Sequence, residues 1–306
     1  MIVALAGGIG GSKLLAGLAR RLPPDKLTIV GNTGDDIELF GLRICPDLDT
    51  ITYTLSGHCN PHTGWGLRDD SFHCLKEIRR MGGEDWFQLG DRDLATHIVR
   101  SGLLREGIPL SEITQRICTS WGVRQRLLPM CESYAPTFLA TDQGRLHFQE
   151  YLVRERALPA VQEIDLGAAA ASHPGPGIPE TIQQARAVIL CPSNPLISIG
   201  PILAVAGMRA LLKDCRAPVI AVSPIVRNDS LKGPSAKMMR ELGYEVSAAG
   251  VAGMYKGLVD IMILDRSDAA LEPRIQALGM DACSTATVMQ TEEDKLRLAD
   301  FILERI

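Results

Sequence analysis

The first 22 residues constrain the fold of this chain most. Five apolar residues, Ile2 to Ala6, precede glycines at positions 7, 8, 10 and 11, and leucines follow at positions 14, 15, 18 and 22. The apolar run predicts a buried strand, and the leucine spacing predicts an amphipathic helix. A glycine-rich turn between a strand and a helix presents backbone N–H groups to an anion. The segment therefore predicts an α/β fold with a phosphate site at its first turn.

This turn departs from both common phosphate motifs. A dinucleotide-binding turn would have a third glycine where Lys13 stands, and a P-loop would have Gly-Lys-Ser/Thr where the order is Gly11-Ser12-Lys13. Lys13 can still supply a positive charge to a phosphate. A tight strand-to-helix turn without a ligand is the alternative. The turn alone thus indicates a phosphate and does not identify the molecule that carries it.

Composition limits the possible partners. The chain has 306 residues, of which 46% are hydrophobic and 22% charged, as expected for a globular protein with a large core. A net charge of -4 gives no electrostatic reason to bind nucleic acid. No apolar run is long enough to span a bilayer, and the chain starts with a strand rather than a signal segment. The eight cysteines include no Cys-x-x-Cys pair, which suits reduced thiols. We therefore expect a cytoplasmic protein that acts on small molecules.

Strands and helices are predicted to alternate along most of the chain. The pattern favours a Rossmann-like, doubly wound, mainly parallel sheet, with residues 1–57 and 176–306 forming the nucleotide-binding core. Residues 58–175 read as an inserted, mostly helical cap domain with a small β-hairpin, in which Asp93 and Ser111 are predicted N-caps. The strands are expected at 2–6, 27–30, 127–130, 137–141, 146–154, 188–190, 219–222, 259–264 and 286–289.

Two further loops have the composition of phosphate sites. Ser193, Asn194 and Ser198 lie between a predicted strand and a helix, and Ser223, Lys232 and Gly233 occupy the next such connection. Hydroxyl, amide and backbone N–H donors in these loops would suit phosphate oxygens. A capped helix start is the alternative for each loop. Three such turns on one sheet edge favour a nucleoside diphosphate.

Two pairs of aspartates follow predicted strands or loops on the same edge. These are Asp35 with Asp36, and Asp47 with Asp49. Carboxylates beside phosphate oxygens suit Mg²⁺, and a carboxylate can orient or deprotonate an attacking hydroxyl. Aspartates of surface turns are the alternative. We expect Asp36 and Asp49 to act in catalysis and to ligate the metal.

Six segments, taken together, resemble the 2-phospho-L-lactate transferases of coenzyme F420 biosynthesis over essentially the whole chain. They are Ala6-Gly-Gly-Ile-Gly-Gly-Ser-Lys13, Asn32-Thr-Gly-Asp-Asp36, Cys45-Pro-Asp-Leu-Asp-Thr50, Leu89-Gly-Asp-Arg-Asp-Leu-Ala-Thr-His97, Cys191-Pro-Ser-Asn-Pro195 and Ser198-Ile-Gly-Pro201.

The resemblance implies an Mg²⁺-dependent transferase. Such enzymes move a phosphorylated three-carbon acid from a guanosine-diphospho donor to the ribityl hydroxyl of the deazaflavin Fo, release GMP and form coenzyme F420-0 or dehydro-F420-0. A homodimer is also implied. The three donor acids (phospholactate, phosphoenolpyruvate and phosphoglycerate) are not distinguished by any residue.

The resemblance also implies the site residues. Asp49 would bind Fo together with Gln88, a position where the family usually has a basic residue, and Trp65, Asp91 and Arg92 would line the acceptor side. The guanosine diphosphate moiety would be held by Gly8, Gly10, Gly11, Ser12, Lys13, Asn32, Thr33, Gly34, Ser193, Asn194, Ser198, Ser223, Lys232 and Gly233.

Two alternatives to the transferase function are considered. A nucleotide-sugar-binding regulatory protein would share the same core, although the Gly90-Asp-Arg-Asp-Leu-Ala-Thr-His97 run and the Trp65 loop favour an acceptor site. An NAD-dependent dehydrogenase would need glycine in place of Lys13 and an acidic, ribose-binding residue in place of Asn32.

Overall fold

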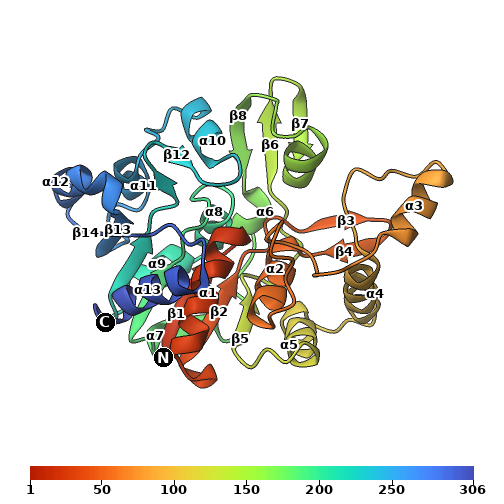
Figure 1. The fold of residues 1–306 in the computed structure, drawn as a ribbon, viewed down its shortest axis with the longest axis horizontal. Coiled ribbons are helices and arrows are strands. Elements are labelled where there is room, and N and C mark those ends of the chain that lie inside the picture. Colours follow the sequence, from red (N-terminus) through yellow and green to blue (C-terminus); the bar gives the residue numbers. More distant parts are fainter.

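A seven-stranded parallel sheet carries the fold (Figure 1). The computed structural model describes all 306 residues. The sheet order is β5-β2-β1-β9-β10-β13-β14, and every neighbouring pair is parallel. This arrangement confirms the predicted Rossmann-like α/β fold. The strands are β1 (Ile2–Ala6), β2 (Leu27–Gly31), β5 (Arg126–Pro129), β9 (Ala187–Leu190), β10 (Val219–Val222), β13 (Ile261–Asp265) and β14 (Asp281–Thr285).

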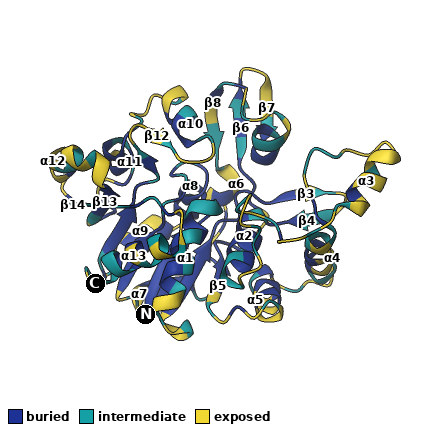
Figure 2. Ribbon diagram, viewed as in Figure 1, coloured by how far each residue is buried: buried dark blue, intermediate teal, exposed yellow.

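The sheet separates two hydrophobic cores. Side chains alternate along β1, so that Val3 and Leu5 belong to one core while Ala4 and Ala6 belong to the other. Because helices cover both faces, the central strands β1, β2, β9 and β10 are buried throughout (Figure 2). The first core contains residues of α6 (Gly167–Ala170), α7 (Ile178–Gln183), α8 (Ile199–Ala204), α9 (Met208–Lys213), α10 (Ser235–Glu241), α11 (Ala248–Met254) and α12 (Glu272–Gln276), and the second those of α1 (Gly8–Arg21), α2 (Pro46–Leu55), α5 (Leu110–Ser120) and α13 (Glu292–Leu303).

Smaller elements surround the side of the large sheet that lies away from the two termini (Figure 1). Two antiparallel two-stranded hairpins and a three-stranded antiparallel sheet make up most of them, together with two helices. No helix is long and apolar enough to cross a membrane. The elements are β3 (Ile37–Leu39), β4 (Leu42–Ile44), α3 (His73–Arg80), α4 (Asp91–Arg105), β6 (Phe138–Thr141), β7 (Gly144–His147), β8 (Val161–Asp165), β11 (Ile225–Val226) and β12 (Asp229–Ser230), with short helical turns at Pro24–Lys26, Glu150–Arg154 and Arg266–Leu271.

Four predictions about these elements were wrong in part. Strand β5, predicted inside the inserted segment 58–175, pairs with β2 at the edge of the large sheet. The predicted strand 146–154 ends at His147, and a helical turn follows at Glu150–Arg154. The His147 N–H donates a hydrogen bond to the Glu150 side chain. The strand expected at 286–289 lies earlier, as β14, and the Thr287 N–H is bonded to Asp265 Oδ2. Helix α5 begins at Leu110, so Ser111 is not its N-cap.

Candidate active site

The strand order reverses between β1 and β9, and a cavity opens at this point. Ligands of doubly wound sheets bind outside the carboxyl ends of the strands at such a reversal. The cavity has a volume of about 370 Å³ and is lined by the loops after β1, β9 and β10 together with residues of the surrounding elements. The predicted phosphate loops therefore do meet at one place.

The start of α1 forms one wall of the cavity. Gly8 has a positive φ of 64°, and its N–H donates to Asp47 Oδ1 at 2.7 Å. A Cβ at position 10 would lie 2.3 Å from the Pro192 carbonyl oxygen, so only glycine lets the loop after β9 come this close. Of the residues predicted in this turn, Gly8, Gly10 and Lys13 line the cavity.

Gly11 and Ser12 lie outside the cavity. A Cβ on Gly11 would approach Ser193 Oγ to 2.5 Å, so this glycine makes room for the serine. The Ser12 hydroxyl is buried and donates to the carbonyl of Gly8 at 2.8 Å within its own helix. Neither residue faces the cavity, in contrast to the direct phosphate contacts predicted for them.

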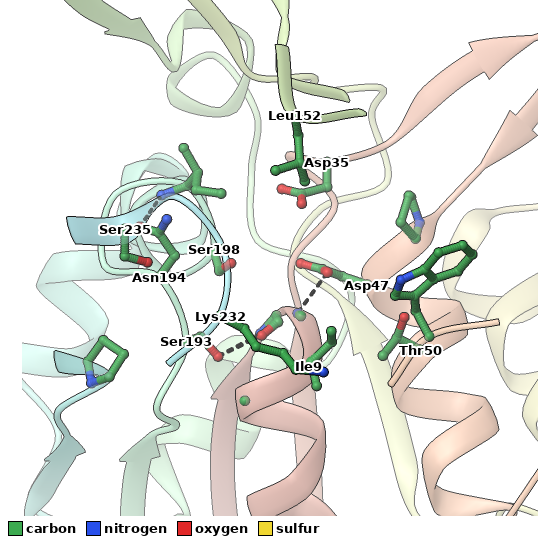
Figure 3. A pocket seen from close by; sticks show the side chains of 18 of the residues that line it. Ile9, Asp35, Asp47, Thr50, Leu152, Ser193, Asn194, Ser198, Lys232 and Ser235 are labelled. Carbon is green, nitrogen blue, oxygen red and sulfur yellow. Dashed lines mark hydrogen bonds between the residues drawn. The ribbon is translucent and has the colours of Figure 1, made fainter. Parts of the chain in front are cut away.

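The loops after β9 and β10 form the opposite wall (Figure 3). All six residues predicted there line the cavity, namely Ser193, Asn194, Ser198, Ser223, Lys232 and Gly233. Ser193 Oγ also donates to the Gly7 carbonyl at 2.7 Å, which joins this wall to the first turn. Asn194 Nδ2 is buried without a hydrogen-bond partner, so a donor is left for a ligand.

Two lysines approach the cavity between these walls. Lys13 Nζ donates to the Met289 carbonyl at 2.7 Å, and Lys232 Nζ donates to the Thr63 carbonyl at 3.4 Å. The pKa of Lys13 is lowered, first by burial and then by the positive charges of Lys232 and Lys295. Positive charges that repel one another in this way favour an anionic ligand between them.

Asp35 and Asp47 form a buried carboxylate pair above the first turn. Both side chains point into the cavity (Figure 3), and Asn32 Nδ2 donates to Asp35 Oδ1 at 2.8 Å and to Asp47 Oδ2 at 2.9 Å. Burial raises the pKa of Asp35 well above its ordinary value, and the charge of Asp47 raises it further. Burial also raises the pKa of Asp47 to about 6. Oxygen ligands of this kind suit a hard divalent cation.

The loop residues after β2 support this pair instead of lining the cavity. Asn32 is buried and its Oδ1 also accepts from the Gly34 N–H at 2.8 Å. Thr33 is buried with its hydroxyl 3.8 Å from Cys131 Sγ. A Cβ at Gly34 would lie 2.8 Å from Pro201, so the loop packs tightly on α8. None of the three contacts the cavity, in contrast to the nucleotide contacts predicted for them.

Asp36 and Asp49, the predicted metal ligands, lie in different surroundings. Asp36 faces away from the cavity, where its Oδ2 accepts from Cys45 Sγ at 3.0 Å and burial raises its pKa to about 7. Asp49 does line the cavity, but Arg100 Nη1 donates to its Oδ2 at 3.1 Å and Arg100 Nη2 donates to its Oδ1. The placement predicted for Asp36 was wrong, because only Asp35 of the two consecutive aspartates faces the cavity.

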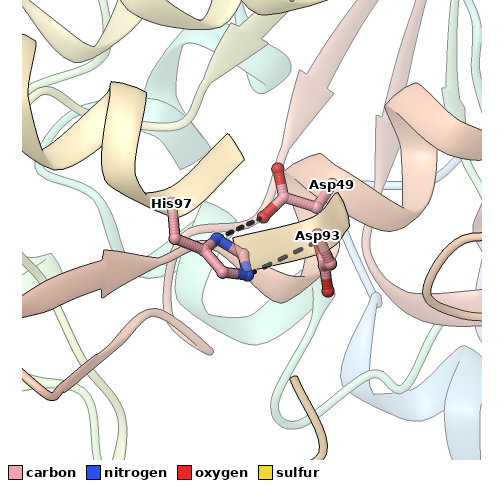
Figure 4. Close-up of side chains that lie close together, drawn as sticks. All are labelled: Asp49, Asp93 and His97. Atoms are coloured by element: carbon pink, nitrogen blue, oxygen red, sulfur yellow. Dashed lines mark ion pairs between the residues drawn. The ribbon is translucent and has the colours of Figure 1, made fainter. Parts of the chain in front are cut away.

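Asp49, Asp93 and His97 lie close together (Figure 4). His97 Nδ1 lies 3.7 Å from Asp49 Oδ2, and His97 Nε2 lies 3.4 Å from Asp93 Oδ1. Their ligand atoms lie within 4.8 Å of one another, as a metal site would require. However, the positively charged guanidinium of Arg100 already neutralises Asp49. Its Nη1 also lies 3.2 Å from His97 Nδ1. A hydrogen-bonded network therefore explains this cluster better than a cation does.

Sequence reasoning missed Asp93 and His97 as site residues. Asp93 was assigned to capping, but α4 begins at Asp91, and the backbone N–H groups of Arg92 and Asp93 donate to Asp70 at 2.9 and 3.0 Å. The available signal was the spacing of four residues, which places Asp93 and His97 on one face of a helix.

Asp91 and Arg92 lie outside the cavity, although acceptor contacts were predicted for them. Asp91 is partly buried and accepts from the Ser71 hydroxyl at 2.6 Å and the Cys74 N–H at 2.9 Å, at the start of α3. Arg92 Nη1 donates to the Arg68 carbonyl at 3.2 Å. Both residues fix the segment before α4 rather than face a ligand.

Aromatic and aliphatic side chains also line the cavity. Its aromatic and aliphatic walls suit a flat heterocycle. Trp65 and Gln88, both predicted acceptor contacts, line the cavity, and Trp65 is 41% exposed. Further apolar residues of the lining include Ile44, Phe87, Phe148, Leu152 and Val153.

Comparisons with known proteins agree with this architecture. The family described as 2-phospho-L-lactate transferase CofD matches residues 2–298. A protein from Streptomyces avermitilis named phosphoenolpyruvate transferase is 46% identical over 300 residues, which cover 96% of this chain and 93% of the relative. A 2-phospho-L-lactate transferase from Methanosarcina mazei is 36% identical and covers 99% of both chains.

A solved structure shows the same fold. It is a UPF0052 family protein from Bacillus halodurans with a TM-score of 0.65 and 16% identity, and the match covers 99% of this chain and 98% of that one. The solved structure shows the fold alone. The family match over nearly the whole chain and the relatives that match over nearly their full length show the family as well. This chain belongs to the CofD family of 2-phospho-L-lactate transferases.

Proposed function

We propose that this protein transfers a phosphorylated three-carbon acid from a guanosine-diphospho donor to the terminal ribityl hydroxyl of the deazaflavin Fo, with release of GMP. The observation that carries the proposal is one cavity whose lining combines two unlike sets of groups. A helix N-terminus, lysines and hydroxyl donors suit a diphosphate, and aromatic and aliphatic side chains suit a heterocycle. A transferase of this kind must hold both substrates in one cavity.

Specific residues would hold the diphosphate of the donor. The N-terminus of α1, Lys13 and Lys232 supply positive charge, and Ser193 and Asn194 supply further donors. The bond that breaks joins the bridging oxygen to the phosphorus on the acid side. Developing charge on that oxygen would be stabilised by these groups as GMP leaves.

Asp35 and Asp47 would hold Mg²⁺. The fit rests on two buried carboxylates that share one donor, Asn32, and whose pKa values are raised mainly by burial. When bound, Mg²⁺ would neutralise charge on the diphosphate oxygens. Asp49 remains near the acceptor end, where its pairing with Arg100 suits substrate binding better than metal binding.

We further propose an enolpyruvyl donor, such as that formed from phosphoenolpyruvate. Relatives from Streptomyces coelicolor and Streptomyces avermitilis named phosphoenolpyruvate transferase are 44% and 46% identical, whereas two Methanosarcina proteins named 2-phospho-L-lactate transferase are 36% and 38% identical. Mass spectrometry of the Fo product formed in competition between the donors tests this choice. A product mass carrying lactate or glycerate as the main species would contradict it.

Binding of Fo separates the transferase from a regulatory protein that binds nucleotide sugars. We expect Fo fluorescence to change on titration with the protein. The Kd for Fo should be lower in the presence of GDP and Mg²⁺. A protein that binds nucleotide sugars but leaves Fo fluorescence unchanged would refute the proposal. The homodimer and the cytoplasmic location remain predictions.

A further inference from the structure

Four carboxylates line the cavity, and they differ in the oxygens that they leave free. Asp47 accepts through both oxygens, from Gly8 and from Asn32. Asp49 also uses both, in its pair with Arg100. Asp35 keeps one free oxygen but belongs to the buried pair that suits a metal ion. Asp93 Oδ2 makes no hydrogen bond within the chain, so it is free to face a substrate.

The other oxygen of Asp93 is firmly held. The Tyr53 hydroxyl donates to Asp93 Oδ1 at 2.7 Å, and His97 Nε2 lies 3.4 Å from the same atom. Burial raises the pKa of Asp93, but His97, Tyr53 and Arg100 together outweigh this and leave the pKa below its ordinary value. Asp93 is therefore an ionised carboxylate with a fixed orientation at the acceptor end.

The contacts of His97 define its tautomer. Arg100 Nη1 lies 3.2 Å from His97 Nδ1, and a guanidinium can only donate. His97 Nδ1 therefore accepts in this contact, and the ring N–H is on Nε2, which faces Asp93. His97 is almost completely buried. Its Nε2 makes no hydrogen bond within the chain and lies 3.4 Å from Asp93 Oδ1, so Asp93 is the carboxylate that this nitrogen faces.

We infer that Asp93 is the catalytic residue that accepts the proton of the attacking acceptor hydroxyl, with His97 as the residue that positions it. This inference rests on the proposed function. The hydroxyl O–H bond breaks, its proton moves to Asp93 Oδ2, and the oxygen forms the new bond to the acid-side phosphorus. The bond from that phosphorus to the bridging oxygen breaks, and its electron pair leaves with GMP.

The location of Asp93 supports this role. The ligand atoms of Asp93 and Asp49 lie within 4.8 Å of each other, so an acceptor bound at Asp49 would come close to Asp93 as well. General base catalysis requires a carboxylate within hydrogen-bond reach of the hydroxyl, in its ionised form. Among the carboxylates that line the cavity, Asp93 alone combines ionisation with a free oxygen outside the metal pair.

The test measures binding and chemistry separately. Single-turnover transfer at saturating Fo, donor and Mg²⁺ is compared for the wild-type protein, Asp93→Asn and Glu106→Gln, an exposed control at the other end of α4. We expect Asp93→Asn to lose about a hundredfold or more of the rate while its Kd for Fo, from fluorescence, changes less than about threefold. The control should stay within about twofold of the wild type.

Several outcomes would overturn the assignment. A rate for Asp93→Asn within about threefold of the wild type would exclude the base role. A Kd for Fo raised about tenfold with an unchanged rate at saturation would make Asp93 a binding residue only. Because asparagine keeps an oxygen for Tyr53, Fo binding by the variant also verifies its fold. If the wild type itself forms no Fo adduct, the proposed function fails instead.

A pair of variants tests the positioning role of His97. Glutamine can place an amide N–H where the Nε2 proton lies and still accept near Arg100, whereas leucine can do neither. We expect His97→Gln to recover most of the rate that His97→Leu loses. If both variants are equally slow, the imidazole does more than donate to Asp93 and the positioning role is wrong.

Discussion

Replacing Arg100 with methionine tests how the acceptor end is held together. Arg100 is the largest fully buried side chain of the protein, and its guanidinium donates to both oxygens of Asp49, which is itself buried. Methionine fills much of the space of the stem but leaves the Asp49 charge without a partner. The contact to His97 Nδ1 is lost as well.

The expected loss of stability is large. Removing one partner of a buried ion pair destabilises a protein by about 3–5 kcal/mol, because the other charge stays buried and unpaired. An exposed pair such as Arg116 with Glu112 contributes only about 0.3–0.5 kcal/mol. Arg116→Met is therefore the matched control and should barely change stability.

Urea unfolding, followed by tryptophan fluorescence and circular dichroism, measures both changes. The double variant Asp49→Asn/Arg100→Met should be more stable than the sum of the single variants predicts, by about 1 kcal/mol or more, because neither partner is left charged and alone. A loss below about 1 kcal/mol for Arg100→Met would show that Asp49 is not a buried charge held by this arginine.

Three further predictions concern the donor end. Gly10→Ala should destabilise the protein by about 1–3 kcal/mol in urea unfolding, because its Cβ would lie 2.3 Å from the Pro192 carbonyl oxygen; unchanged stability would contradict the close approach. Lys13→Ala should weaken binding of the guanosine-diphospho donor by about tenfold in calorimetry, and unchanged affinity would exclude a phosphate contact. In EDTA, stability should fall as the pH rises from about 4 to about 6. The folded state binds the Asp47 proton more tightly than the unfolded state, so the ionised form above pH 6 is disfavoured. Asp47→Asn should reduce this fall and the gain on adding Mg²⁺, and an unchanged pH slope would contradict the raised pKa.

The sequence predicted the core well where the signal is local. The apolar run of β1 and the leucine spacing of α1 gave both elements, and the glycines between them marked the turn that faces the cavity. Strand β5 was assigned to the inserted segment. Its partner β2 lies about a hundred residues earlier, and several helices separate the two strands in the sequence. Local periodicity cannot show which sheet a short strand joins.

The sequence predicted which loops meet at the site. It did not predict which side chains of these loops face the cavity. Asp35 and Asp36 are consecutive and chemically identical, so only the structure shows which one faces the cavity. Asp93 has a common local role at a helix start, which concealed its contacts with Tyr53 and His97. Asn32 and Ser12 were assigned to the ligand, whereas each supports neighbouring groups through hydrogen bonds.

The most direct test of the account is the stoichiometry of one reaction. The protein is mixed with Fo, Mg²⁺ and a guanosine-diphospho three-carbon acid, and the Fo adduct and the nucleotide product are quantified together by liquid chromatography and mass spectrometry. We predict one GMP for each Fo adduct formed, and neither product when Fo or Mg²⁺ is left out. Release of GMP without an adduct, or binding of the donor without any turnover, would contradict the transferase function.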